Sequence, residues 1–297
     1  AQAILAQAIL RRRSSMRSCM DASALASLSC ADFVKAIGGA YEGSPWVVEQ
    51  AYSHASGPFD SITALSAGLR VVVAEASEAE QRSLVAAAAE HSRCSALIGQ
   101  DELSDEEKRR MADLLEEYRR KFGFDFVLAA PGASARTALA ALQARVRGAA
   151  CGELVRALEH VHRLAWLRLR ELVRPNPTGF LTCHVLDTMN GRPAAGMAIT
   201  LRRFNEESKD WRTIGRFVTN ADGRLGDGPA IKAGELRHGS YELAFGVGDY
   251  FEAVSASAVG TPFLADVPVR FGVDNEEAHY HVPLLCSPWS YSTYRGS

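Results

Sequence analysis

The segment "RPNPTG" at 174–179 separates two patterns of hydrophobic residues, and this change of pattern decides the fold. Before it, from about residue 31 to 172, apolar residues recur at the three- and four-residue spacing of amphipathic helices. After it, they alternate or form short runs, as in "LTCHVLDT" at 181–188, and turns such as "ADGR" separate the runs. We therefore predict two domains joined by a proline-rich linker at 173–178.

The N-terminal region has the signals of several helices. Ser104 followed by Glu107 is the sequence of a capping box, and a stripe of apolar residues follows it. Ser134 stands at the N-cap position of the next helix, which Gly148 ends, and a third apolar stripe covers 154–172. Helices joined by short loops predict an all-α helical bundle over 29–172.

The C-terminal region has at least six short strand patterns in about 120 residues, which predict a β-sandwich over 179–297. The other end of the chain differs from both domains. "AQAILAQAILRRRSSMRSCM" at 1–20 is rich in arginine and has no acidic residue. Such a composition is typical of organelle transit segments, but a disordered or truncated leader explains it equally well. We exclude 1–28 from the predicted fold.

The overall composition excludes several classes of protein. The 297 residues include 33 Lys and Arg and 35 Asp and Glu, so no strong charge favours nucleic acid or an anionic membrane. No apolar run approaches the roughly 18 residues of a membrane span. The six cysteines are scattered without a Cys-x-x-Cys pair, which favours a reducing compartment over a disulfide framework or a zinc site.

Polar residues on two of the predicted strands are candidates for a site. Thr182 and His184 share one strand face, and His279 and His281 share a face of a later strand. Arg224 stands in the turn between other strands. A histidine on a half-apolar strand is more often structural than catalytic, and spacing alone does not bring these residues together. The residues by themselves leave both interpretations open.

Three segments closely resemble the 5-hydroxyisourate hydrolases, the enzymatic branch of the transthyretin family. They are "LTCHVLDTMNGRPAAGMAITL" at 181–201, the turn "TNADGR" at 219–224 and "HYHVPLLCSPWSYSTYRGS" at 279–297. The resemblance covers about 178–297 and implies hydrolysis of 5-hydroxyisourate. It also implies a homotetramer with sites in a channel between dimers, and a peroxisomal location, although cytosol or another organelle stays open. The implied catalytic residues are His184, Arg224 and His281, and the implied substrate-binding residues are Tyr294, Arg295, Gly296 and Ser297.

These residue types fit the chemistry of that reaction. Opening a lactam bond with water needs a base whose pKa lies near neutrality, and histidine is the usual one. An arginine fork can orient carbonyl oxygens and stabilise the charge that develops on them. No third histidine or carboxylate accompanies the pair at the spacing of metal ligands, so we predict no metal and no cofactor. The sequence leaves open which of the two histidines is the base.

The helical region resembles another enzyme family over about 29–172. "DFVKAIGGAYEGSPWVVEQAY" at 32–52 and "ELVRALEHVHRLAWLRLREL" at 153–172 are similar to the decarboxylases that act on 2-oxo-4-hydroxy-4-carboxy-5-ureidoimidazoline (OHCU). OHCU is the product of the hydrolase reaction. The order of the two regions is that of the bifunctional allantoin synthases.

One stretch departs from the decarboxylase pattern, which has a His-Pro pair followed by Ser-x-x-Glu-Gln. Our alignment places Ala88 where the catalytic histidine belongs, with Glu90 and His91 as possible substitutes. On a helix, His91 is rotated by about 300° from Ala88 and so points in a similar direction. Arg145 matches the family's substrate-binding arginine. We predict weak or absent decarboxylase activity that depends on His91, whereas the alternative is a fully bifunctional enzyme.

An interpretation from another class is a non-catalytic small-molecule binding protein of the transthyretin type. That interpretation expects a lysine at the position of His184 and a chain without the Tyr-Arg-Gly-Ser sequence. This chain has a histidine at position 184 and does carry Tyr-Arg-Gly-Ser, and both observations favour the enzyme. In both interpretations the partner is a small molecule, with no nucleic acid and no membrane.

Overall fold

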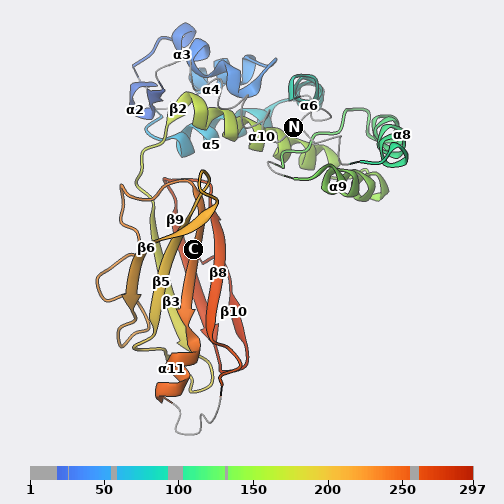
Figure 1. Cartoon of the computed structure of the whole chain (residues 1–297). Helices are drawn as coiled ribbons and strands as arrows, with labels where there is room; N and C mark the ends of the chain where they lie inside the picture. The colour runs from blue at the N-terminus through green and yellow to red at the C-terminus, as the bar shows by residue number, and fades with distance from the viewer. Residues whose placement is uncertain are drawn as a thin grey trace. The chain divides into compact units, whose positions relative to one another are not determined.

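The computed structural model describes residues 19–25, 27–54, 59–92, 103–130, 133–254 and 261–296. The chain divides into two compact units, Ala1–Arg174 and Pro175–Ser297 (Figure 1). The division lies inside the segment 173–178, where the hydrophobic period changes from helical to alternating. Among the described residues, no helix is both long enough and apolar enough to cross a bilayer.

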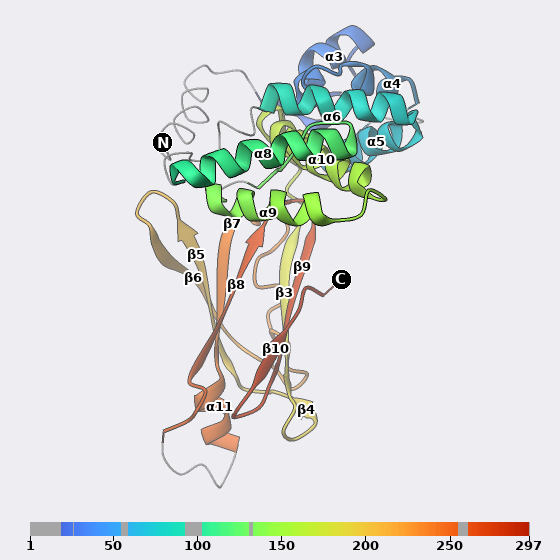
Figure 2. The same cartoon turned by 90° about the vertical axis from the view of Figure 1, so that its right-hand side faces the viewer.

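The first unit is a helical bundle, as predicted, in which α10 lies against η1, α5 and α6, while α8 packs on α9 (Figure 2). A two-stranded parallel pair joins the beginning of the unit to its end. Its elements are β1 (Met20–Asp21), α2 (Ala22–Leu25), α3 (Cys30–Ile37), the 3-10 helix η1 (Gly38–Tyr41), α4 (Trp46–His54), α5 (Ile62–Glu75), α6 (Glu78–Ser92), α8 (Asp105–Phe122), α9 (Ala135–Arg147), α10 (Glu153–Leu172) and β2 (Val173–Arg174).

The ends of α8 and α9 follow the capping signals in the sequence. The Ser104 side chain accepts from the Glu107 N–H while the Glu107 carboxylate accepts from the Ser104 N–H, which completes the predicted capping box. Such a cap stabilises a helix by about 1 kcal/mol. Gly123 ends α8 with φ of +76°, a left-handed conformation that favours glycine. Ser134 caps α9 as predicted.

The helical unit begins earlier than the sequence predicted. Met20 and Asp21 of β1 pair with Val173 and Arg174 of β2, although 1–28 had been assigned to a leader. Ala22 is 3% and Leu25 is 1% exposed, so both belong to the core of the unit. The boundary at residue 28 is therefore wrong for the part of the leader that the structure describes. A short segment held by pairing with residues about 150 positions away has no period of its own for sequence analysis to detect. Residues 1–18 lie outside the described part of the chain.

The second unit is the predicted β-sandwich of two four-stranded sheets. One sheet has the order β10-β9-β3-β4 and the other the order β6-β5-β7-β8, and β3 with β9 is a parallel pair. The strands are β3 (Phe180–Asp187), β4 (Arg192–Pro193), β5 (Ala198–Asn205), β6 (Asp210–Val218), β7 (Gly239–Gly246), β8 (Asp266–Val273), β9 (His279–Cys286) and β10 (Tyr291–Thr293).

The alternation along β3 separates a core face from an outer face. Leu181, Cys183 and Val185 are buried between the sheets, whereas Thr182 and His184 are only partly buried. This is the face assignment that the alternating sequence predicted. It leaves the polar side chains of β3 on the outer face of the sheet β10-β9-β3-β4.

A helix stands where the sequence predicted a turn. The glycines of "GVGDY" at 246–250 predict a turn between strands, but α11 (Val247–Val254) begins there and lies at one end of the sandwich (Figure 1). Val247, Tyr250 and Phe251 are buried, so three and four residues separate its apolar positions. The sequence does not predict the helix because Gly246 before it and Gly248 within it resemble turn residues, and one eight-residue helix gives only a short period.

Candidate active site on the outer face of the β-sandwich

The parallel pairing of β3 with β9 brings the two predicted histidine strands together. Thr182 pairs with His281 and His184 pairs with Pro283 in this register. The side chains of Thr182, His184 and His281 therefore lie on the same outer face of the sheet, and His279 lies one pair further along. Residues about 100 positions apart in the sequence become neighbours in this way.

The turn that carries Arg224 docks against β3. The Val185 N–H donates to the Gly223 carbonyl at 2.9 Å, and Arg224 forms an isolated bridge with His184. A side chain at position 223 would place its Cβ 2.3 Å from the Val185 oxygen, and φ there is +70°. Only glycine fits this approach. Asn220 closes the turn, because its Oδ1 accepts from the Arg224 N–H at 3.0 Å.

The two catalytic candidates differ in their hydrogen bonds. The His184 Nε2 lies 2.9 Å from the Asp222 carbonyl oxygen. A carbonyl only accepts, so this nitrogen carries a proton and donates it. In a neutral His184 ring, Nδ1 is then the nitrogen with the lone pair. The turn that positions Arg224 therefore also orients His184.

His281 forms its hydrogen bond through Nδ1, whereas His184 forms its hydrogen bond through Nε2. Its Nδ1 lies 2.9 Å from the Thr182 Oγ1, which also lies 2.8 Å from the His279 Nε2. Burial lowers the pKa of His281 below its usual value, and the positive charge of Arg224 and the neighbouring His279 and His184 lower it further. His281 is therefore neutral at neutral pH, which is the protonation state of a general base.

The segment that follows the last strand reaches the site. β10 covers Tyr291–Thr293, after which the backbone returns to β9 through a bridge between Gly296 and His281. The Gly296 N–H donates to the His281 carbonyl at 3.0 Å, and a Cβ at position 296 would lie 2.5 Å from the His281 Cδ2. The Arg295 guanidinium lies over the Tyr280 ring at 4.8 Å, and Tyr294 is exposed. Ser297 lies outside the described residues.

The structure brings together the three predicted catalytic residues, and Gly296 closes on one of them. Sequence analysis placed Thr182 and His279 on the correct faces but assigned them no role. The alternation of the two strands was the available signal, whereas their register was not visible in the sequence. Within the described ranges, no group of three His, Cys, Asp or Glu residues is arranged to hold a metal ion.

The helical unit places its candidate residues differently. Ala88 of α6 is 3% exposed and belongs to the core, and Glu90 is exposed at the surface of the same helix. The side chain of His91 lies outside the described part of the structure. The structure therefore does not bring Glu90 to the position of Ala88.

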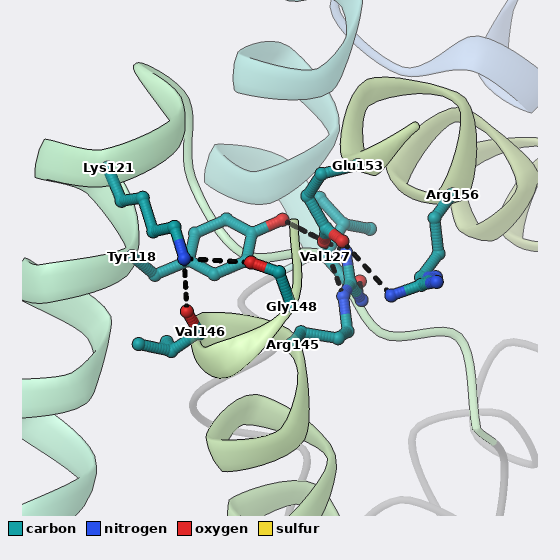
Figure 3. Close-up of polar contacts among 8 residues, drawn as sticks. All are labelled: Tyr118, Lys121, Val127, Arg145, Val146, Gly148, Glu153 and Arg156. Carbon is teal, nitrogen blue, oxygen red and sulfur yellow. Dashed lines mark hydrogen bonds and ion pairs between the residues drawn. The ribbon is translucent and has the colours of Figure 1, made fainter. Parts of the chain in front are cut away.

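Arg145 lies in a buried network that joins three helices (Figure 3). Its Nε donates to the Glu153 carboxylate at 2.6 Å, its Nη1 to the Val127 carbonyl at 2.7 Å and its Nη2 to the Tyr118 hydroxyl at 3.0 Å. The Tyr118 hydroxyl donates to the same carboxylate oxygen at 2.6 Å. Only 6% of the Arg145 side chain is exposed. These contacts connect α8, α9 and α10, and substrate binding by Arg145 stays a prediction.

Comparison with known proteins gives a family for each unit. Residues 181–296 match the model of the HIUase/transthyretin family, in which HIUase stands for 5-hydroxyisourate hydrolase. Residues 26–170 match the model of the OHCU decarboxylases. The 5-hydroxyisourate hydrolase of Deinococcus radiodurans is 50% identical over 117 residues, which are 39% of this chain and 95% of that protein. The mouse (Mus musculus) 5-hydroxyisourate hydrolase is 38% identical over 117 residues, which are 39% of this chain and 94% of that protein.

A solved structure resembles both units together. The crystal structure of (S)-allantoin synthase is 40% identical, covers 94% of this chain and 100% of its own, and has a TM-score of 0.81. The two-domain fold, and the sheet face that carries His184, Arg224 and His281, thus define an enzyme of the urate degradation type. The chain belongs to the HIUase/transthyretin family through its β-sandwich, and it carries an OHCU decarboxylase domain before it.

Proposed function

We propose that the β-sandwich hydrolyses 5-hydroxyisourate to OHCU. The observation that carries this function is the convergence of His184, Arg224 and His281 on one face of the sheet from three separate segments. The 50% identity to a 5-hydroxyisourate hydrolase supports the choice of substrate. The product is the substrate named for the family to which the helical unit belongs.

In this proposal each of the three side chains has a different role. His281 is neutral and takes a proton from water as the water oxygen attacks the lactam carbonyl. The Arg224 guanidinium orients the substrate's oxygens and stabilises the negative charge that develops on the attacked carbonyl. His184 is oriented by its bond to the Asp222 carbonyl and completes the water site. Breaking the ring C–N bond then releases the product, and its nitrogen takes up a proton.

Alanine variants test these roles. His184→Ala, Arg224→Ala and His281→Ala should each lower kcat/KM by about 10²-fold, the scale for a positioned base or an oxyanion-stabilising group. His238→Ala is the matched control, because His238 is an exposed histidine of the same unit outside this face. Rates within about threefold of the control for all three variants would refute the assignment.

We also propose that the β-sandwich assembles as a homotetramer that shares its sites between subunits. Support comes from exposed aromatic residues on the segment that leads to Gly296, Trp289, Tyr291 and Tyr294, which a single copy leaves uncovered. Light scattering combined with activity measurements on dilution tests this assembly. A monomer that is fully active would contradict it.

A second candidate function is the complete conversion to (S)-allantoin by both units. The similarity to (S)-allantoin synthase across 94% of the chain favours it. The buried Ala88 in place of a catalytic histidine opposes it. The handedness of the allantoin formed distinguishes the two cases, because spontaneous decay of OHCU gives a racemate.

A further inference from the structure

The hydroxyl group of Thr182 lies between two histidine rings of β9. Its Oγ1 is 2.9 Å from the Nδ1 of His281 and 2.8 Å from the Nε2 of His279. A hydroxyl has one proton, so it can donate to only one of these rings and must accept from the other. The two hydrogen bonds therefore couple the tautomers of the two histidines.

Two arrangements of protons satisfy this geometry. In the first, Thr182 donates to the Nδ1 of His281, which then carries its own proton on Nε2 and cannot accept one there. In the second, the Nδ1–H of His281 donates to Thr182, and Thr182 donates to the Nε2 of His279. Only the second arrangement leaves a lone pair on the Nε2 of a neutral His281.

We infer that Thr182 and His279 are positioning residues that hold His281 in the Nδ1–H tautomer, with Nε2 as the catalytic base. This inference rests on the proposed hydrolase function and names the base within that site. The Nε2 of His184 cannot accept a proton from water, because it carries a proton that it donates to the Asp222 carbonyl. The two candidate histidines are therefore not equivalent.

The surroundings of the two rings hold them beside Thr182 and disfavour a charged His281, and among neutral arrangements only the second leaves a base on Nε2. His279 stacks on Phe180 with centroids 4.2 Å apart and an interplanar angle of 17°, which fixes its ring beside Thr182. The charged or titratable groups that act on His281 are Arg224, His279 and His184, and all of them disfavour a proton on it. A neutral base with one nitrogen held by Thr182 offers its other nitrogen to water.

Removing the Thr182 hydroxyl tests this role. In Thr182→Val the His281 ring loses its acceptor, so both tautomers form and the ring is less well oriented. We expect kcat to fall by about 10- to 100-fold, the scale for loss of a group that orients a catalytic side chain, with KM changed less than about threefold. Thr182→Ser should restore the rate to within about threefold. The imidazolium also loses a partner, so the acid limb of the pH profile should move to lower pH.

A double-mutant cycle tests the part played by His279. His279→Phe keeps an aromatic ring against Phe180 but removes the acceptor, so the Thr182 proton can turn toward His281 and favour the wrong tautomer. We expect a loss similar to that of Thr182→Val, and a double variant no slower than Thr182→Val alone. Thr200→Val is the control, because Thr200 lies on β5 in the other sheet. Additive losses would overturn the coupling.

NMR of the full chain with ¹⁵N-labelled histidine rings reads the tautomer directly, and the His281 signals are those missing from His281→Gln. We expect the Nδ1–H form in the wild type and a mixture in Thr182→Val. An Nε2–H form in the wild type, or an unchanged rate in Thr182→Val, would overturn the inference. A wild type that does not accelerate the decay of 5-hydroxyisourate would instead refute the proposed function, and the tautomer would still be measured.

Discussion

Gly296 is the position at which one methyl group should disable the site. An alanine there would place its Cβ 2.5 Å from the His281 Cδ2, about 1 Å closer than carbon atoms pack. The His281 ring cannot retreat freely, because its Nδ1 is held 2.9 Å from Thr182. Either the ring moves by about 1 Å or the last residues leave β9. Overpacking of this kind costs about 1–3 kcal/mol, and a displacement of 1 Å in a catalytic group costs about 10²-fold in rate.

We therefore expect Gly296→Ala to lower kcat/KM for 5-hydroxyisourate by about 10²-fold, and its packing cost to lower the melting temperature of the β-sandwich by about 4–12 °C, so that the variant is assayed well below its unfolding transition. The assay is the ultraviolet decay of 5-hydroxyisourate made by uricase from urate. Gly272→Ala is the control, since a Cβ at position 272 of β8 meets no atom within 4 Å. A Gly296→Ala enzyme within about threefold of the control would refute the packing of the tail on His281.

Three further predictions concern the helical unit and pH. Burial lowers the pKa of His162 to about 4 in the folded protein, whereas in the unfolded chain it stays near the usual value of about 6.5. As the pH falls from 6.5 to 4, the unfolded chain therefore takes up a proton on His162 that the folded protein does not, and about 3 kcal/mol of stability should be lost. Urea unfolding should show this loss in the wild type but not in His162→Gln. Arg145→Met removes the buried partner of Glu153, which keeps the Tyr118 hydroxyl and the more exposed Arg156, and should destabilise the unit by about 1–3 kcal/mol in thermal unfolding without changing hydrolase activity, whereas an arginine that only binds substrate would leave stability unchanged. Fresh OHCU should give allantoin with a weak circular dichroism signal, and a strong single-handed signal that persists in His91→Ala would show that Ala88 does not occupy the position of the catalytic histidine.

Sequence analysis predicted the parts of the fold that depend on residues close together in the sequence. The change of period at 174–179 gave the two units, and Ser104 and Ser134 marked helix starts that the structure confirms. The alternation along β3 placed Thr182 and His184 on one face. These features depend on neighbours within a few positions, so the sequence carries them directly.

The parts that were missed depend on contacts between distant segments. The pairing of β1 with β2 and the parallel register of β3 with β9 arise only when the chain is folded. The ion pair between Arg145 and Glu153 joins two helices, and no motif spacing announces it. The resemblance to known families supplied the candidate catalytic residues, but it did not show that the Thr182 hydroxyl lies within hydrogen-bond distance of both His281 and His279.

The most direct test of the account follows the ultraviolet spectrum of urate oxidised by uricase, with and without a catalytic amount of the full chain. We predict that 5-hydroxyisourate disappears much faster than it does spontaneously, that OHCU accumulates and decays slowly, and that the Arg224→Ala protein loses the first effect. Decay of 5-hydroxyisourate at the spontaneous rate in the presence of the folded wild-type protein would contradict hydrolysis by the β-sandwich and favour a non-catalytic binding protein.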